Sequence, residues 1–260
     1  AYDAANEQIQ LNNATPNLTY DANGNLISQT DATGITTYTW DARNRLIGIS
    51  GPSVSASFVY DALGRRVSKT INGVRTDYQY DGNDIIAEIG GGAIGANYLR
   101  SLRVDEPFVR QGSSNEYYHA DALGSTLSLT NTSGAITTGY TYEGFGKTTI
   151  TGTSTNPLQY TGRENDGTGL YYYRARYYSP TVQRFLSEDP KECNRIKGKN
   201  LYVFVENNPI NYIDPFGLDK EPSCPPDGCS GQSVRCIFSL RTLPTSLACL
   251  SICAKICLVG

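Results

Sequence analysis

An aromatic residue followed by aspartate recurs every twenty residues in the first third of the chain, and this repeat constrains the fold more than any other feature. The pairs are Tyr20-Asp21, Trp40-Asp41, Tyr60-Asp61 and Tyr80-Asp81. The phrase after each Asp also recurs, as DANGNL at 21–26, DARNRL at 41–46, DALGRRV at 61–67 and DALGSTL at 121–127, with a shorter copy, DATGI, at 31–35. A fixed internal period is typical of a repeat architecture in which each unit packs against its neighbours.

Each phrase predicts the tip of a β-hairpin. Asp at the first position of a turn can bond the backbone two residues on, and Gly or Asn at the fourth position tolerates a positive φ. We therefore expect turns at Asp21–Gly24, Asp61–Gly64 and Asp121–Gly124. Between turns, aromatic side chains fall on every second residue in 36–40 and 76–80, so one face of each strand is expected to be buried.

The repeat favours one long sheet of hairpins over an ordinary β-sandwich. Sandwiches also show turn signals about every 8–12 residues, but they do not usually repeat an aromatic-Asp pair in fixed register. The register loosens around Gly90-Gly91-Gly92 and returns at Tyr117-Tyr118-His119-Ala120-Asp121. We expect the unit to run unbroken to about residue 160.

The composition agrees with strands and turns and argues against several classes of function. Only 39% of residues are hydrophobic, and 22 Lys and Arg nearly balance 25 Asp and Glu. The formal charge of -3 predicts no general affinity for nucleic acid. The sequence has no nucleophile elbow, metal-ligand constellation or phosphate loop, so no cofactor, no metal and no external-substrate enzyme is expected.

Neither a signal peptide nor a membrane span is expected in this sequence. The N-terminus is polar and lacks a signal peptide, and no apolar run reaches the ~18 residues of a membrane span. Because the chain contains no Met and begins in mid-pattern, it reads as part of a longer polypeptide.

Beyond the repeats, residues 160–218 carry motifs that resemble a known family. They are YTGRE at 160–164, GLYYYRARYYSP at 169–180, RFLSEDP at 184–190 and NLYVFVENNPINYIDPFGL at 200–218. With the upstream repeats they resemble the Rhs repeat-associated core of the Rhs/YD-repeat family, which includes bacterial polymorphic toxins, C components of insecticidal toxin complexes and the shell of animal teneurins. The resemblance implies an all-β fold, in which a YD-repeat β-hairpin ribbon forms part of a hollow shell. It divides the chain into a shell fragment (1–159), a core ending in DPFGL (160–218) and a short Cys-rich tail (219–260).

The resemblance also implies a self-cleavage site. In bacterial members the core acts as an intramolecular aspartyl protease that cuts after the Leu of the DPxGL motif. Carried onto this sequence, Asp189 and Asp214 form the catalytic pair, and the scissile bond joins Leu218 to Asp219. Two carboxylates held close share a proton, so one can activate water while the other protonates the amide. Arg184 is expected to orient one carboxylate or hold it ionised.

Simpler interpretations of these residues stay open. Asp189-Pro190 and residues 214–217 also fit type I turns, which would not exclude catalysis. Gln183, Ser179 and Thr168 depart from the family pattern, at positions that affect turn geometry more than the catalytic pair. The tyrosines at 171–173 and 177–178 could offer a stacking surface for sugars or bases, but burial between layers explains them better. Lone His119 is expected to be a strand-face residue, since it replaces the Tyr of a repeat.

The tail holds six of the seven cysteines and begins with a Pro-rich stretch that is typical of a linker. Its 42 residues are too few for a complete enzyme without disulfides or metal. Cys249, Cys253 and Cys257 would share one stripe of a helix, where burial would suffice to explain them. A metal site, disulfides and a membrane-active peptide remain alternatives.

These observations predict the encapsulation shell fragment of an Rhs-type toxin, with autoproteolysis after Leu218 that releases the tail. The partners expected are the tail itself as cargo, and an immunity protein or a secretion-system component. The expected location is secreted or at the cell surface. The alternative is a teneurin-like adhesion module that binds carbohydrate or protein without proteolysis.

Overall fold

An antiparallel ribbon of fourteen strands makes up most of the computed structural model, which describes residues 1–11, 17–190 and 200–222. Its strands are β1 (Leu18–Tyr20), β2 (Leu26–Asp31), β3 (Gly34–Trp40), β4 (Leu46–Ser50), β5 (Ser55–Tyr60), β6 (Arg66–Ile71), β7 (Val74–Asp81), β8 (Asp84–Gly90), β9 (Ala93–Arg100), β10 (Pro107–Gln111), β11 (Asn115–Ala120), β12 (Thr126–Thr130), β13 (Ile136–Tyr142) and β14 (Thr148–Gly152). Each strand pairs with its neighbours in sequence, so the order in the sheet is the order in the chain.

Two smaller sheets follow the ribbon. The first contains β15 (Glu164–Asn165), β16 (Tyr171–Tyr173), β17 (Arg176–Ser179) and β18 (Arg184–Phe185), and the second contains β19 (Tyr212–Ile213) and β20 (Glu221–Pro222). Two short 3-10 turns, η1 (Tyr160–Gly162) and η2 (Val205–Asn207), are the only helical elements in the described ranges. The prediction of an all-β fold built on a hairpin ribbon is confirmed.

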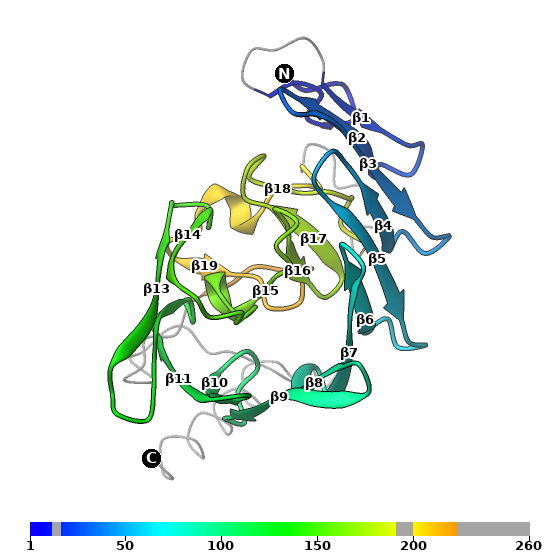
Figure 1. Ribbon diagram of the computed structural model, residues 1–260. Helices are drawn as coiled ribbons and strands as arrows, with labels where there is room; N and C mark the ends of the chain where they lie inside the picture. The colour runs from blue at the N-terminus through cyan, green and yellow to red at the C-terminus, as the bar shows by residue number, and fades with distance from the viewer. Residues whose placement is uncertain (12–16, 191–199, 223–260) are drawn as a thin grey trace, which may run out of the picture.

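The ribbon curves into a wall, and the core segment lies on its concave side (Figure 1). We use the name core segment for the described residues of 160–218. In Figure 1, β1 to β5 form one arm of the wall, β8 and β9 form its base, and β13 and β14 form the other arm, with β15 to β19 between the arms. Within the part of the chain that is described, no helix is long and apolar enough to cross a bilayer.

The predicted hairpin tips are present. At the first tip, Asp21 accepts hydrogen bonds on Oδ1 from the backbone N–H groups of Asn23 and Asn25, both at 2.9 Å. Gly24 has a φ of 74° and donates its N–H to the Asp21 carbonyl at 3.1 Å. The same bonds form at Asp61 and at Asp121, which confirms that the phrase encodes its turn locally.

The repeated aromatic residue ties its own strand to the start of the preceding strand. Tyr60 donates its hydroxyl proton to the Leu46 carbonyl at 2.6 Å, and Tyr80 does the same to the Arg66 carbonyl at 2.8 Å. The Trp40 indole N–H reaches the carbonyl at the start of β2 at 2.8 Å. In each case the register of the ladder with the following strand shifts just before the aromatic residue, as in a β-bulge.

The ribbon and the core segment share one hydrophobic interior. Leu26 and Leu46 from the ribbon are buried in the same cluster as Leu186 and Tyr177 from the core segment. Leu26 also donates its backbone N–H to the Leu186 carbonyl at 2.8 Å. The tyrosines of residues 171–173 are all buried, which confirms packing as their role.

His119 is an exposed residue of β11, as expected, and its Nε2 lies 3.0 Å from the Thr130 hydroxyl. All seven cysteines lie outside the described residues, and with them the predictions for the tail.

Candidate functional site

The Asp214–Leu218 turn docks against the tight turn that joins β16 to β17. Three successive carbonyl oxygens of this segment each accept a hydrogen bond. The donors are the guanidinium groups of Arg163 and Arg174 to Pro215, the backbone N–H of Ala175 to Phe216 at 3.2 Å, and Arg176 Nε to Gly217 at 2.5 Å. The turn is therefore held by bonds to three successive carbonyl oxygens just ahead of the predicted scissile bond.

Gly217 allows this close approach. Its φ is 67°, and a Cβ on this residue would collide with the Tyr173 carbonyl oxygen and press on the Arg176 backbone nitrogen. Both the backbone conformation and the space therefore require glycine at the fourth position of the DPFGL motif.

The two predicted catalytic aspartates meet at one guanidinium group. Arg176 Nη2 lies 2.9 Å from Asp189 Oδ2 and 3.6 Å from Asp214 Oδ2. The Arg176 and Asp214 side chains are each 3% exposed. Arg176 also stacks on Phe185, with 3.7 Å between the guanidinium carbon and the ring centroid. A buried cation between two carboxylates compensates their charge at short range.

The pKa of the Asp214 carboxyl is raised to about 6. Burial is the main cause, and the nearby Asp189 adds to it. Arg176 and the N–H groups of Leu218 and Gly217 act in the opposite direction, because they stabilise the carboxylate. Leu218 donates its N–H to Asp214 Oδ1 at 2.9 Å. Asp214 can therefore carry or release a proton close to neutral pH, as an acid-base catalyst must.

The predicted scissile bond borders the same cavity as the aspartates. A cavity of about 370 Å³ is lined by Arg176, Asp189, Asp214, Leu218 and Asp219, together with residues of the 200–206 stretch and Lys220. The structure thus brings together four of the five residues singled out in the sequence.

Arg184 lies apart from this cavity. Its guanidinium contacts the Tyr2 hydroxyl at 2.9 Å and Asn207 Oδ1 at 3.4 Å. The arginine that contacts the aspartates is Arg176, which the sequence had indicated only as part of a tyrosine-rich strand. Arg176 begins β17 next to the docked turn, and linear spacing gave no signal for that position.

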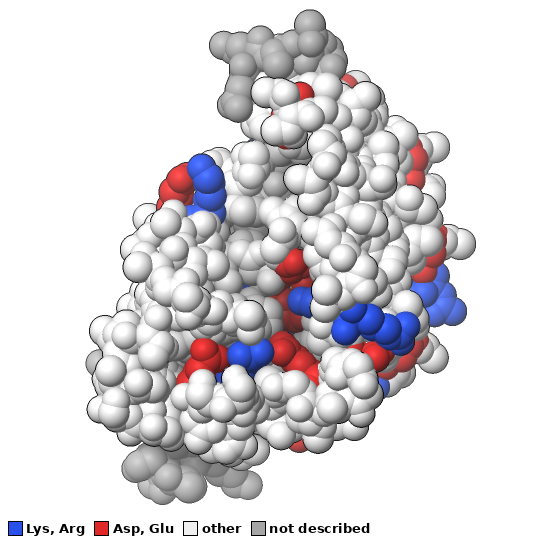
Figure 2. Space-filling view, in the orientation of Figure 1, with Lys and Arg blue, Asp and Glu red and all other residues white. Residues whose placement is uncertain are grey.

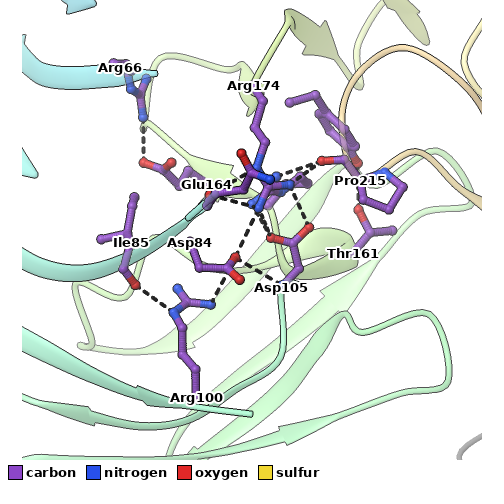
Figure 3. Close-up of polar contacts among 12 residues, drawn as sticks. Arg66, Asp84, Ile85, Arg100, Asp105, Thr161, Glu164, Arg174 and Pro215 are labelled. Atoms are coloured by element: carbon purple, nitrogen blue, oxygen red, sulfur yellow. Dashed lines mark hydrogen bonds and ion pairs between the residues drawn. The ribbon is translucent and has the colours of Figure 1, made fainter. Parts of the chain in front are cut away.

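A second group of charges joins acids of the ribbon to two arginines that hold the Pro215 carbonyl (Figure 3). Asp105, in the loop between β9 and β10, accepts from Arg163 Nη2 at 2.6 Å and from Arg174 Nη2 at 2.7 Å. Arg174 also reaches Asp84 Oδ1 at the start of β8, at 3.1 Å. Both arginines in turn donate to the Pro215 carbonyl.

A third charged group joins β6 to the core segment. Arg66 is fully buried and donates to Glu164 Oε2 at 2.6 Å and to Asp166 Oδ1 at 2.9 Å. Lys69 adds a bond to Asp166 at 3.0 Å. Acidic and basic groups of this kind are visible in the hollow between the ribbon and the core, while much of the surrounding surface is uncharged (Figure 2). One sequence signal could have found Arg66, since it occupies the phrase position where Leu26 and Leu46 are buried.

Among the described residues, no three His, Cys, Asp or Glu side chains are grouped as a metal site requires. The charged groups named above are paired with one another instead.

The chain is similar in sequence to several known proteins. Residues 20–53 match the family model described as RHS Repeat. Toxin subunit YenC2 of Yersinia entomophaga is 47% identical over 66 residues, which are 25% of this chain and 7% of that protein. The tRNA3(Ser)-specific nuclease WapA of Bacillus spizizenii is 31% identical over 238 residues, which are 84% of this chain and 10% of that protein.

The fold is also found in solved structures. The crystal structure of TcdB2-TccC3 is similar with a TM-score of 0.56 and 24% sequence identity, over 76% of this chain and 11% of that chain. The complex of TcdB2-TccC3 with Cdc42 is similar with a TM-score of 0.59 and 24% identity, again over 76% of this chain and 11% of that chain. This chain spans between 7% and 11% of the length of the four proteins named above.

Proposed function

The chain belongs to the Rhs/YD-repeat family, and from that premise we propose that it closes a toxin-associated shell and cuts its own backbone after Leu218. In this proposal the ribbon and core, 1–159 and 160–218, form the wall and its closing segment. Residues 219–260 are the cargo that the cut separates. The protein is exported or surface-associated, and an immunity protein or secretion component is its partner outside the shell.

One observation carries the proposal. Asp189 and Asp214 lie 2.9 and 3.6 Å from the same Arg176 nitrogen, in a cavity whose wall includes both Leu218 and Asp219. Burying a charged group costs roughly several kcal/mol. Two turns with no further role would not need to bury two carboxylates and a guanidinium next to the Leu218–Asp219 bond.

These positions support the following reaction. Asp189, paired with Arg176, acts as the base and takes a proton from water as the water oxygen attacks the Leu218 carbonyl carbon. Asp214, whose pKa is about 6, acts as the acid and protonates the Asp219 nitrogen as the C–N bond breaks. The products are a Leu218 carboxylate and an Asp219 amine. The two carboxylates are therefore held together by the positive charge of Arg176, and not by a shared proton as the sequence analysis expected.

Intact mass spectrometry of the full-length protein tests this proposal. We expect the wild type to give two fragments that separate between Leu218 and Asp219, with a first-order rate that does not change on dilution. Asp189→Asn and Asp214→Asn should each stay whole, because an amide neither accepts nor releases the required proton.

The matched control is Asp61→Asn, at a hairpin tip where Asn can also cap the turn. It should be cut at the wild-type rate. An intact Leu218–Asp219 bond in folded wild type would instead make the chain a non-cleaving shell, and cutting by either aspartate variant would remove that residue from the mechanism.

A further inference from the structure

The peptide that precedes the predicted cut is held by arginines of the core segment, and residues of the ribbon bind those arginines in turn. The Pro215 carbonyl accepts from Arg163 Nη1 at 3.0 Å and also from Arg174 Nη1. Pro215 directly follows Asp214, and Gly217 two residues later is held by Arg176. The position of Asp214 and of the bond after Leu218 therefore depends on where these arginines lie.

Two buried guanidinium groups that converge on one carbonyl oxygen repel each other. The side chains of Arg163 and Arg174 are 6% and 15% exposed, so water screens this repulsion little. Burial lowers the pKa of Arg163, and the charge of Arg174 lowers it further. The arrangement needs a negative charge at the same place to hold both cations.

Asp105 supplies that charge from the ribbon. Its Oδ1 accepts from Arg163 at 2.6 Å and from Arg174 at 2.7 Å, and its Oδ2 accepts from Arg174 at 3.0 Å. Burial opposes ionisation of Asp105, but the two arginines outweigh it and lower the pKa of this carboxyl. The residue is therefore an anion that both cations share.

The loop that carries Asp105 is itself fixed in place. Asp105 has a φ of 66° and donates its backbone N–H to Asp84 Oδ1 at 3.2 Å. Its carbonyl oxygen lies so close to Gly162 that a Cβ there would touch it at 2.7 Å. Figure 3 shows Asp84, Asp105 and Arg174 converging from the ribbon and the core near Pro215.

From this geometry we propose that Asp105 is a positioning residue that couples self-cleavage to docking of the core segment on the ribbon. Without the Asp105 charge, Arg163 and Arg174 do not hold the Pro215 carbonyl, and the segment up to Leu218 moves out of register with Asp189 and Asp214. The inference rests on the proposed function for its cleavage step. Its structural step, the clamping of residues 214–218, stands independently.

The test uses Asp105→Asn in the full-length protein, with Asp77→Asn as the matched control. Asp77 also pairs with an arginine, Arg75, but both residues of this pair are exposed on β7. Cleavage is followed by pulse-chase in cell-free synthesis. We expect Asp105→Asn to be cut about 10- to 100-fold more slowly, the range for a misplaced reacting group, and Asp77→Asn to match the wild type.

The pH dependence separates positioning from chemistry. Because Asp105 touches no reacting atom, the residual cleavage of Asp105→Asn should keep the wild-type pH midpoint while its rate falls at every pH. A shifted midpoint would mean that Asp105 acts on the charge of the catalytic pair, and a rate within twofold of wild type would show that it positions nothing.

Hydrogen exchange of residues 214–218 tests the clamp without cleavage. In a chain kept whole by Asp189→Asn, adding Asp105→Asn should speed exchange of the Gly217 and Leu218 amides at least tenfold and leave the ribbon amides unchanged. Unchanged exchange overturns the inference even if cleavage is slowed. If the wild type is never cut but exchange rises as expected, the proposed function fails and the clamp stands.

Should Asp105→Asn not fold, Arg174→Gln supplies the second variant. It removes one donor to Pro215 and leaves the ion pair between Arg163 and Asp105 in place. Because Arg163 still donates to the Pro215 carbonyl, a smaller rise in exchange at residues 214–218 is expected than in Asp105→Asn, and unchanged exchange counts against the clamp.

Discussion

Replacing Arg66 by Met should cost far more stability than removing an exposed arginine of the same ribbon. Arg66 is 0% exposed and bonds two carboxylates, Glu164 and Asp166, that are themselves buried. Met fills a similar volume but removes the ion pair of Glu164 with Arg66 and leaves Asp166 to pair with Lys69. Removing one partner of a buried ion pair costs about 3–5 kcal/mol, which is the loss expected here.

The measurement is equilibrium unfolding in urea, followed by the fluorescence of the single tryptophan. Trp40 is suited to this because its indole N–H bonds the Leu26 carbonyl inside the wall. The free energies of unfolding of wild type and Arg66→Met are compared, provided that both proteins show the same dependence of this free energy on urea concentration. Arg75→Met is the matched control, since Arg75 pairs with Asp77 on the exposed surface, and its midpoint should stay at the wild-type value.

The stability difference between wild type and Arg66→Met should also change with pH in a defined direction. In the wild type, burial opposes the charge of Asp166, but Arg66 and Lys69 outweigh it and lower its pKa. This stabilisation is present above the pKa of Asp166 in the unfolded chain and is lost only as the pH falls through its lower pKa in the folded protein. It is therefore constant between about pH 5 and 7. Without Arg66, burial should raise the pKa of Asp166 instead, and the deficit of the variant should shrink as the pH falls from about 7 to 5. A loss under about 1 kcal/mol, or a deficit that grows in acid, would refute the reasoning.

Three further results are expected. Gly217→Ala should abolish cleavage because its Cβ meets the Tyr173 carbonyl, whereas Gly134→Ala, with a φ of 80° and open space around it, should be cut normally; equal rates would contradict the docking argument. Because the pKa of Asp214 is raised to about 6, its stabilising contribution is present in acid and is lost as the pH rises. In urea unfolding, wild type should therefore lose about 3 kcal/mol of stability relative to Asp214→Asn between about pH 4 and 7. A stability difference that does not change with pH would contradict the raised pKa. Tyr60→Ala should cost about 3 kcal/mol and Tyr60→Phe about 1, the latter from its lost hydroxyl bond, and a change of a few tenths in the Ala variant would show that the ring is not packed.

The hairpins could be predicted because their determinants are local. Asp21 and Gly24 make their bonds within one turn, so a four-residue phrase carries the whole signal. The stretch around Gly90-Gly91-Gly92 lost the phrase but kept the sheet, since Gly91 and Gly92 form a turn with φ values of 59° and 83°. The ribbon continues through it to β14, which ends at Gly152.

The site was predictable only in part, because its members come from segments that no linear pattern connects. The resemblance supplied Asp189 and Asp214, but not the arginine between them. Arg184 and Arg176 sit on adjacent strands, and only their directions separate them: Arg184 turns toward Tyr2 and Arg176 toward the docked turn.

The ribbon side of the site left even less trace. Asp105 stands 58 residues before Arg163, in a loop without any repeat phrase. Such partners are chosen by tertiary packing, which spacing along the chain does not report.

The sequential order of the ribbon strands has a consequence for how the molecule is made. Every ribbon strand pairs only with the strand before and after it, so the wall has low contact order and can grow hairpin by hairpin as the chain leaves the ribosome. The core segment is different, because its contacts join residues far apart in the sequence. Arg66 and Asp166 are 100 residues apart, and Tyr2 and Arg184 are 182 residues apart. We therefore expect the ribbon to fold first during synthesis and the core segment to dock on it last. On this expectation Asp189 and Asp214 come together only after the whole ribbon has been synthesised.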